Sequence, residues 1–585
     1  MTDTAAGAFT FVLHSHLPYA RRAGRWPHGE EWIHEAASET YLPLLDALRR
    51  LQREGIPVRL TIGLTPVLVE QLADRLVLEN LVTFMSERRD YAAEDIIRFE
   101  QLREPERAAI ARWYRDWYNH LLRFLEEDLG GDIVGGFKEL QDADLIEIAT
   151  SAATHGYLPL MARDSTIRAQ IGTGVGAYRR HFGRDPRSIW LPECAYRPAY
   201  IADDGTVRSG LETFVGEFGL KVFFVETHTI EGGRPVGKAA GDAVGPYGDI
   251  HRRWVIPLPP ASEPTHFSTY QPYWVSEPRV AAIGRNNRTG LQVWSAEHGY
   301  PGEARYREFH KRDGVSGLHY WRVTGPRVDL GDKRLWNPED AFEHVQMHAD
   351  HFTDLVTDLL VDYREQTRTR GLISAAFDTE LFGHWWFEGV EWLAQVLRRL
   401  AARPEVELTS AGRYVGEHPP EVVLNLPESS WGEGGGHFVW DNAATRWMWP
   451  VVHDAEARME SIAARTADAI GPIRTLAEQA AREALLLQSS DWPFLITTGQ
   501  AKDYAAERFE NHAERFNQIC DLIEAGDTSD EAQRVAARYF ELDNVFPDVD
   551  VSLFRAHTPA ATAGVAVDRR PSGRGQDTTG ASRRR

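Results

Sequence analysis

The chain has 585 residues, 43% of them hydrophobic, and a formal net charge of −21 at pH 7. This hydrophobic content supports a large core and excludes disorder as the global state, and the acidic charge argues against nucleic acid or an anionic membrane as the main partner. The 18 Trp, 19 Tyr and 25 Phe exceed what a core needs and suit a neutral ligand with flat apolar faces.

Short β-branched and aromatic runs alternate with helical patterns over the first 415 residues. The runs predicted as buried strands cover residues 9–16, 58–66, 188–196, 221–228, 291–298 and 371–380. Strand followed by helix, repeated, indicates a parallel sheet, either a barrel or a doubly wound sheet. Residues 85–130 are helical and charged and predict a helical insertion, whereas the Gly- and Pro-rich residues 231–275 predict a long loop over one face.

The strand pattern largely stops after residue 415. Residues 416–556 have helical periodicity and predict a separate α-helical domain. The polar, weakly basic residues 557–585 predict a disordered tail. The glycine-rich stretch from Gly172 to Gly176 looks like a phosphate-binding loop, but no strand precedes it, so we interpret it as part of a helix.

The number of cysteines and the length of the apolar runs indicate the cellular compartment of the protein. Only Cys194 and Cys520 occur, which gives no disulfide framework and no zinc cluster of cysteines. The N-terminal run lacks a basic region and is too short for a signal peptide, and no stretch reaches the roughly 18 apolar residues of a transmembrane helix. We therefore expect a cytoplasmic protein that does not bind membranes.

The predicted strands end on chemically active side chains, among them Glu193 and Asp378. In a parallel barrel the carboxyl ends of all strands lie at one face, and that face carries the active site. Either carboxylate alone could equally cap a following helix. Two of them on one sheet, with aromatic residues nearby, favour glycosyl transfer by one nucleophile and one acid/base.

His14 and His16 lie on the same face of the first predicted strand. Two such histidines could hold a metal ion, as in deacetylase-type barrels. A third ligand would have to come from elsewhere, and no HExxH motif is present. We favour hydrogen bonding of His14 and His16 to sugar hydroxyls.

The motifs HSHLPY, GLTPVL, WLPECAY and SAAFDTELFGHWW, in this order and spacing, resemble glycoside hydrolase family 57. AATHGYLPL, QVWSAEHGYPG, SSWGEGGGHFVW, SSDWPFLITTGQAKDYA and LDNVFPDVD are similar to the α-1,4-glucan branching enzymes within that family. The resemblance covers about residues 8–555. It implies an α/β fold, a distorted (β/α)7 barrel over residues 1–415 with the helical insertion, followed by an α-helical domain over 416–556 that closes the cleft.

The resemblance also implies roles for individual residues. Glu193 matches the nucleophile and Asp378 the general acid/base. The residues that it places in glucan subsites are His14, Trp32, Trp294, Trp431, Trp440 and Asp491, with a mobile loop around Tyr247. No metal or other cofactor is implied, and an α-glucan such as amylose or glycogen serves as donor and acceptor.

The implied chemistry is a retaining double displacement. Glu193 attacks the anomeric carbon of an α-1,4-linked residue while Asp378 protonates the departing oxygen, and a 6-hydroxyl then replaces Glu193 to form an α-1,6 branch. Retention requires the two carboxyl groups to lie about 5–5.5 Å apart. We expect burial and a neighbouring charge to raise the pKa of Asp378, and hydrogen bonds to keep Glu193 ionised.

Transfer requires an acceptor sugar to react before water does. Trp431 and Trp440 flank a run of glycines, which is a poor core segment, and we expect a flexible acceptor wall that stacks on sugars and excludes water. Packing in the core is the commoner role of a single tryptophan.

Several alternatives share parts of this pattern. An α-amylase or 4-α-glucanotransferase of the same family shares the covalent intermediate and differs in the acceptor. A metal-dependent polysaccharide deacetylase would use His14 and His16. A non-catalytic glycan-binding protein would not need both carboxylates.

Overall fold

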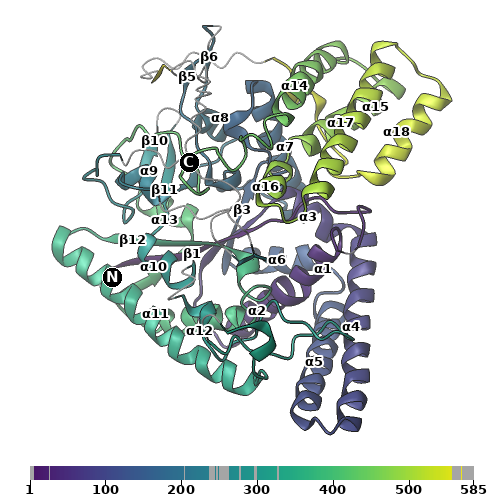
Figure 1. Ribbon diagram of the computed structural model, residues 1–585. Helices are drawn as coiled ribbons and strands as arrows, with labels where there is room; N and C mark the ends of the chain where they lie inside the picture. Colours follow the sequence, from purple (N-terminus) through teal and green to yellow (C-terminus); the bar gives the residue numbers. More distant parts are fainter. Residues whose placement is uncertain are drawn as a thin grey trace, which may run out of the picture.

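The computed structural model (Figure 1) describes residues 5–556, apart from 26, 203–204, 236–243, 246–247, 250–261, 276–278, 295–298 and 326–327. About half of the predicted loop at 231–275, including Tyr247, therefore lies outside the described residues. The predicted tail at 557–585 does too, except for strand β14 (Asp568–Arg569), which pairs with β5 (Tyr200–Ile201). No helix in the described part of the chain is long and apolar enough to cross a membrane.

A parallel sheet forms the centre of the N-terminal region. Its described parallel strands are β1 (Gly7–Ser15), β2 (Leu60–Leu64), β3 (Ile146–Ser151), β4 (Ser188–Trp190), β7 (Val222–Val225), β11 (Val280–Gly284) and β12 (Gly371–Asp378). They lie in the order β11-β7-β4-β3-β2-β1-β12, and each pair of neighbours is parallel. The two ends of the sheet approach each other, because Asn286 N–H donates to the Ser374 carbonyl at 2.9 Å. The predicted distorted (β/α)7 barrel is confirmed.

Two further strands extend this sheet. The antiparallel strand β10 (Tyr273–Val275) pairs with β11, and the short β13 (Val406–Leu408) pairs with the beginning of β1. Away from the barrel, β6 (Val207–Arg208) pairs with β5, and β8 (Val244–Gly245) pairs with β9 (Gly248–Asp249).

The alternation of side chains along β1 determines which of them reach the barrel interior. Phe9 and Phe11 pack outward against Phe352 and Trp392, on the helices around the barrel. Because successive strand residues point to opposite faces, His14 lies on the other, interior face. Every residue of β1 is buried.

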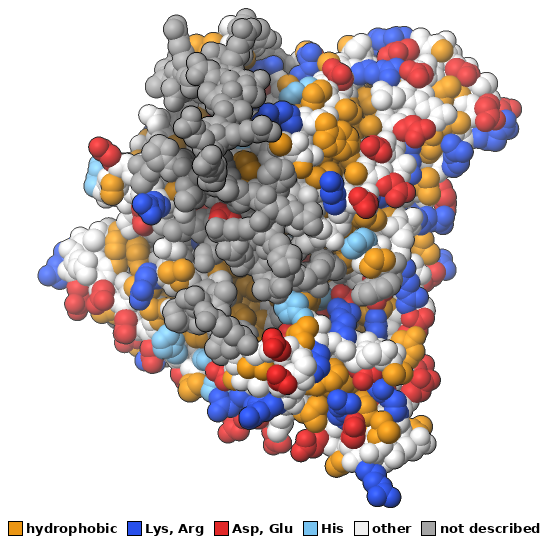
Figure 2. Space-filling model, viewed as in Figure 1, with side chains coloured by type: hydrophobic (Ala, Val, Ile, Leu, Met, Phe, Trp, Pro, Cys, Tyr) orange, Lys and Arg blue, Asp and Glu red, His pale blue; other side chains and the backbone are white. Residues whose placement is uncertain are grey.

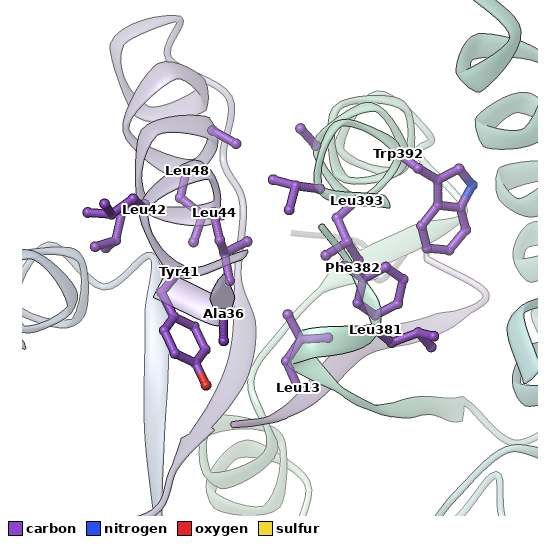
Figure 3. Packing of buried hydrophobic residues seen from close by; sticks show 14 of the residues in the cluster. Leu13, Ala36, Tyr41, Leu42, Leu44, Leu48, Leu381, Phe382, Trp392 and Leu393 are labelled. Carbon is purple, nitrogen blue, oxygen red and sulfur yellow. The ribbon is translucent and has the colours of Figure 1, made fainter. Parts of the chain in front are cut away.

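Helices cover the outside of the barrel. In chain order they are α1 (Glu31–Ala36), α2 (Leu42–Arg53), α3 (Pro66–Ala73), α6 (Ile133–Asp142), α7 (Asp164–Phe182), α8 (Leu211–Glu217), α9 (Thr227–Glu231), α10 (Asn287–Trp294), α11 (Pro338–Thr367), α12 (Gly389–Ala401) and α13 (Ala411–Glu417). Figure 3 shows α2 and α12 facing each other, with Leu44, Leu48 and Leu393 between them. Gly172 to Gly176 lie inside α7, as predicted.

The predicted helical insertion is a hairpin of α4 (Arg75–Gln101) and α5 (Pro105–Arg123), which projects at the lower right of Figure 1. It begins ten residues before the predicted start at 85. The Asp74 carboxylate accepts hydrogen bonds from the backbone N–H groups of Leu76 and Val77, and this cap starts α4.

One predicted strand is wrong. The segment 291–298 continues helix α10 up to Trp294, and residues 295–298 lie outside the described residues. The Asn286 side chain caps this helix by accepting from Thr289 N–H at 3.0 Å. The strand of this part of the barrel is the earlier run β11, and the prediction also missed β3.

The C-terminal part of the chain is helical, as predicted. It contains α14 (Met448–Arg465), α15 (Pro472–Leu487), α16 (Asp491–Thr498), α17 (Lys502–Glu524) and α18 (Asp530–Leu542), at the upper right of Figure 1. These helices share a core of their own, which also takes in Tyr19 and Trp32 from the barrel. Residues 418–447 form an irregular segment without helices or strands, so the boundary at 416 stays a prediction.

Candidate functional site

Strand ends bring the two predicted carboxylates to one face of the barrel. Asp378 is the last residue of β12 and pairs in register with His14 of β1. Glu193 lies in a short turn, Pro192–Cys194, directly after β4. Its φ is +61° and that of Cys194 is +50°, a left-handed conformation that costs non-glycine residues of order 1–3 kcal/mol and often marks functional sites.

Two donors from the C-terminal part of the chain hold the Glu193 carboxylate. Trp431 Nε1–H donates to Oε2 at 2.8 Å, and Ser490 Oγ–H donates to Oε1 at 3.0 Å. The Trp431 backbone N–H also donates to the Glu193 carbonyl at 3.1 Å. The carboxylate is therefore fixed by the irregular segment and by the residue before α16.

The pKa of Glu193 is raised to about 7. Burial is the main cause, the Trp431 hydrogen bond lowers the pKa, and the negative charge of Asp491 raises it further. The expectation that hydrogen bonds keep Glu193 ionised needs correction, because they lower its pKa by less than burial raises it.

Asp378 has different surroundings. Burial raises its pKa well above the usual value, and the charges of Glu380 and Glu193 add to the rise while Arg285 opposes it. The predicted direction of this shift is confirmed. No described residue donates a hydrogen bond to the Asp378 carboxylate. The charge interaction places Asp378 and Glu193 near each other, and the spacing of about 5–5.5 Å that retention requires stays a prediction.

A chain of hydrogen bonds connects His14 to Glu193. His14 Nε2 lies 3.1 Å from His155 Nε2, and His155 Nδ1 lies 2.8 Å from Ser490 Oγ, which donates to Glu193. The His14 ring also stacks on Trp190, with centroids 4.8 Å apart. Sequence reasoning missed His155 and Ser490, although both stand in motifs that resemble branching enzymes.

His16 is held by acidic groups. Its Nε2 lies 2.9 Å from Asp491 Oδ1, and its backbone N–H donates to Glu380 Oε1 at 3.2 Å. Burial lowers the pKa of His16, but Asp491, Glu193 and Glu380 outweigh it and raise the pKa. Glu380 also accepts from the Tyr41 hydroxyl. The prediction did not include Glu380 or Tyr41 among the site residues.

The metal hypothesis for His14 and His16 gains no geometric support. Nδ1 of His16 lies 3.1 Å from the Thr65 hydroxyl and Nε2 contacts Asp491, so both ring nitrogens have partners. Within the described ranges, the groups of three residues with metal-ligand spacing lie elsewhere: Glu303, His344 and His348, and Glu483, His512 and Asp543.

The predicted tryptophans occupy three environments. Trp440 is fully buried and stacks on Tyr157, with centroids 4.3 Å apart, so in this conformation its ring does not reach the surface. Trp32 is buried between the barrel and the helical domain, 5.4 Å from the Tyr504 ring. Trp294 is half-buried at the end of α10.

The glycines between Trp431 and Trp440 form a close-packed turn. Gly434 and Gly435 have φ values of +85° and +71°, which favour glycine. A Cβ on Gly432 would come within 2.8 Å of the Trp440 ring. In this structure the expected flexible wall is therefore packed, and its glycines serve turn geometry and close approach.

Models of two protein families match the chain. The model for glycosyl hydrolase family 57 matches residues 10–427, and the model described as 1,4-alpha-glucan branching enzyme, C-terminal, matches residues 451–554. The chain is 42% identical over 559 residues to a 1,4-alpha-glucan branching enzyme of Thermococcus kodakarensis, covering 94% of this chain and 79% of that protein.

Solved structures agree with the match. The crystal structure of the family 57 branching enzyme from Thermococcus kodakaraensis has a TM-score of 0.84 at 40% identity and covers 97% of this chain and 100% of that one. The branching enzyme of Pyrococcus horikoshii gives 0.82 at 38% identity, over 95% and 98% of the two chains. The alpha-amylase AmyC from Thermotoga maritima gives 0.78 at 28% identity, over 94% and 99%. The chain belongs to glycosyl hydrolase family 57.

Proposed function

We propose that this chain is a 1,4-α-glucan branching enzyme, which cleaves an α-1,4-glucan and transfers the segment to a 6-hydroxyl with retention of configuration. The observation that carries the proposal is the pair of hydrogen bonds that the Glu193 carboxylate accepts from Trp431 and Ser490. One donor, Ser490, stands within the stretch that matches the C-terminal region of branching enzymes, and the other, Trp431, stands in the segment before it. The relatives with the printed activity support the same reaction.

In the first step the Glu193 carboxylate attacks the anomeric carbon of the donor chain. The bond to the departing 4-oxygen breaks, and Asp378 gives that oxygen its proton. The products are a glycosyl ester on Glu193 and a shortened glucan. Asp378 is then ionised.

In the second step Asp378 takes the proton of an acceptor 6-hydroxyl, whose oxygen attacks the same anomeric carbon. The ester bond to Glu193 breaks, and an α-1,6 linkage forms. The proton that left Asp378 in the first step is thereby restored, and Glu193 is again a carboxylate. Two inversions give net retention.

The negative charge of Glu193 is one of the causes that raise the pKa of Asp378, so the protonation of Asp378 depends on its neighbour. The pKa of Asp378 is raised well above its usual value, whereas Glu193 has two donors that stabilise its charge. We therefore place the proton that the first step needs on Asp378, and the negative charge on Glu193. This is the distribution that the first step requires.

Glucan subsites are proposed around this pair. His14 Nδ1 is buried and has no hydrogen-bond partner among the described residues, which leaves it available for a sugar hydroxyl. His16 with Asp491, Trp431 and the half-buried Trp294 form the further proposed contacts. Trp32 and Trp440 support these contacts from behind, and Tyr247 stays a prediction.

An α-amylase of the same family is the second candidate, because AmyC shares the fold over almost the whole chain. The enzymes differ in the acceptor that resolves the intermediate. A deacetylase would need a metal at His14 and His16, which the contacts of His16 do not favour.

Incubation with amylose separates these activities. New α-1,6 linkages, counted after enzymatic debranching, in clear excess over new reducing ends would support branching. Reducing ends without α-1,6 linkages would indicate an amylase, and redistribution of linear chain lengths without either would indicate a 4-α-glucanotransferase. The cytoplasmic location and a role in glycogen synthesis stay predictions.

A further inference from the structure

Helix α11, on the outside of the barrel, carries histidines at helical spacing. His344 and His348 are four residues apart and so lie on one face of the helix. Glu303, from the segment between α10 and α11, reaches the same face, and its Oε2 lies 3.4 Å from His344 Nε2. Figure 2 shows pale-blue histidine side chains on the surface over α11.

One ligand atom from each of Glu303, His344 and His348 can be chosen so that all lie within 4.8 Å of one another. The three side chains are half-buried, so the group is open to solvent on one side. Two imidazole nitrogens and one carboxylate oxygen are a ligand set that suits Zn²⁺, with a water completing four-coordination.

A second layer of contacts orients His348. The Tyr306 hydroxyl lies 2.7 Å from His348 Nδ1, and Tyr306 is fully buried. With its proton on Nδ1 and donated to the Tyr306 oxygen, the ring presents the lone pair of Nε2. Metal-binding histidines are neutral and are oriented by a hydrogen bond to the other nitrogen.

We propose that Glu303, His344 and His348 form a binding site for Zn²⁺ on helix α11, separate from the catalytic carboxylates. The bound ion would tie the segment around Glu303 to the helix. That segment already packs inward through Tyr306, whose ring lies 5.5 Å from that of Trp386 in the stretch after Asp378. The site is therefore a cross-link in the outer layer of the barrel.

Arg305 competes with the ion. Its Nη1 lies 3.2 Å from Glu303 Oε1 and 3.2 Å from His344 Nδ1. The side chain is 42% exposed, and its Nε lies 3.5 Å from Asp340, so the guanidinium has another acidic partner when it leaves the site. Removing this positive charge should tighten Zn²⁺ binding.

The test is calorimetric titration of the full chain with ZnCl₂ at neutral pH, in the parent and in single variants. We expect one site in the parent, affinity at least about tenfold weaker in His344→Ala and His348→Ala, and a smaller loss in Tyr306→Phe. His351→Ala is the matched control, because His351 lies on the same helix but bonds Tyr300 at 2.7 Å and is outside the group. It should bind Zn²⁺ like the parent, and Arg305→Gln should bind more tightly.

Thermal unfolding gives a second readout. Zn²⁺ should raise the unfolding midpoint of the parent and of His351→Ala, and not that of His344→Ala or His348→Ala, since an ion that binds the folded state stabilises it. Circular dichroism without zinc shows whether each variant is folded. Parental affinity in both His344→Ala and His348→Ala would overturn the site, and so would loss of binding in His512→Ala alone, which would move the ion to the buried group in the helical domain. Unchanged or weaker binding by Arg305→Gln would contradict the competition.

Discussion

The surroundings of the two carboxylates differ in where their contacts come from. Glu193 is held by Trp431 and Ser490, both more than 230 residues away in sequence. Asp378 lies at the end of β12 next to β1 and accepts no hydrogen bond from any described residue. The C-terminal half of the chain thus fixes one carboxylate, and the barrel alone places the other.

This difference separates the proposed roles. A nucleophile must hold one orientation and a negative charge, and two donors supply both. An acid/base must gain and lose a proton, and burial beside other carboxylates makes the protonated form of Asp378 stable while leaving its oxygens free. With the proposed roles, orientation of the nucleophile and proton transfer come from two different parts of the chain.

The largest expected effect comes from Glu193→Gln. The amide keeps the size of the side chain but does not attack the anomeric carbon, so we expect branching and hydrolysis both to fall by about 10⁴-fold or more. Reducing ends and α-1,6 linkages from amylose measure the two reactions, and circular dichroism checks the fold. Turnover comparable to the parent would end the assignment of the nucleophile.

Asp378→Asn should also be inactive on amylose, with one asymmetry. A maltosyl substrate with an activated leaving group needs little protonation, so the variant should still form the ester on Glu193. The ester should accumulate, because no base activates the acceptor. Mass spectrometry of the Glu193 peptide detects it. If no adduct forms while Glu193 is intact, the acid/base role of Asp378 is wrong.

Much of this arrangement could be predicted from the sequence, because strand-end residues obey a simple geometric rule. Glu193, Asp378 and His14 all followed apolar runs, and a parallel barrel gathers such ends at one face. The helical insertion and the C-terminal helices followed from periodicity and charge.

The features that were not predicted depend on contacts between distant segments, which a local sequence pattern does not reveal. Ser490 stands before α16 and contributes to the site only because the helical domain packs against the barrel. His155 follows β3, a strand whose sequence, IEIATS, contains one charged residue and two hydroxyl residues and so did not look like a buried strand. Segment 291–298 was predicted as a strand because its apolar residues are β-formers, but the cap at Asn286 makes it a helix. Trp440 was predicted at the surface of the wall because a glycine run does not reveal burial.

Trp431→Phe removes one of the two donors to the Glu193 carboxylate and keeps an aromatic ring. The proposed nucleophile Glu193 must be ionised to attack, and its ionised fraction rises with pH through its pKa of about 7. Losing a hydrogen bond to a charged group, worth about 1.5–3 kcal/mol, raises that pKa by about 1–2 units. The acidic limb of kcat/KM should therefore move to higher pH, with about a tenfold loss at pH 7.

Trp440→Phe, at the other end of the glycine run, is the control for Trp431→Phe. Trp440→Phe changes a neighbouring buried indole whose N–H donates no hydrogen bond to any described residue, and should leave the acidic limb in place even if stability falls. If Trp431→Phe lowers activity equally at all pH values, its indole is a packing group and does not tune the nucleophile.

The smallest expected effect is that of Ser490→Ala. The Ser490 hydroxyl donates to Glu193 Oε1 at 3.0 Å and contacts His155 Nδ1, but it lowers the pKa of Glu193 less than the Trp431 indole does. The acidic limb of kcat/KM should again move to higher pH, by less than about one unit. Ser489→Ala is the matched control, since the Ser489 hydroxyl donates to Asp491 Oδ2 at 2.6 Å and does not reach Glu193. Parallel pH profiles of the two serine variants would show that the helical domain covers Glu193 without acting on its charge, and the division of roles between the two regions would then rest on Trp431 alone.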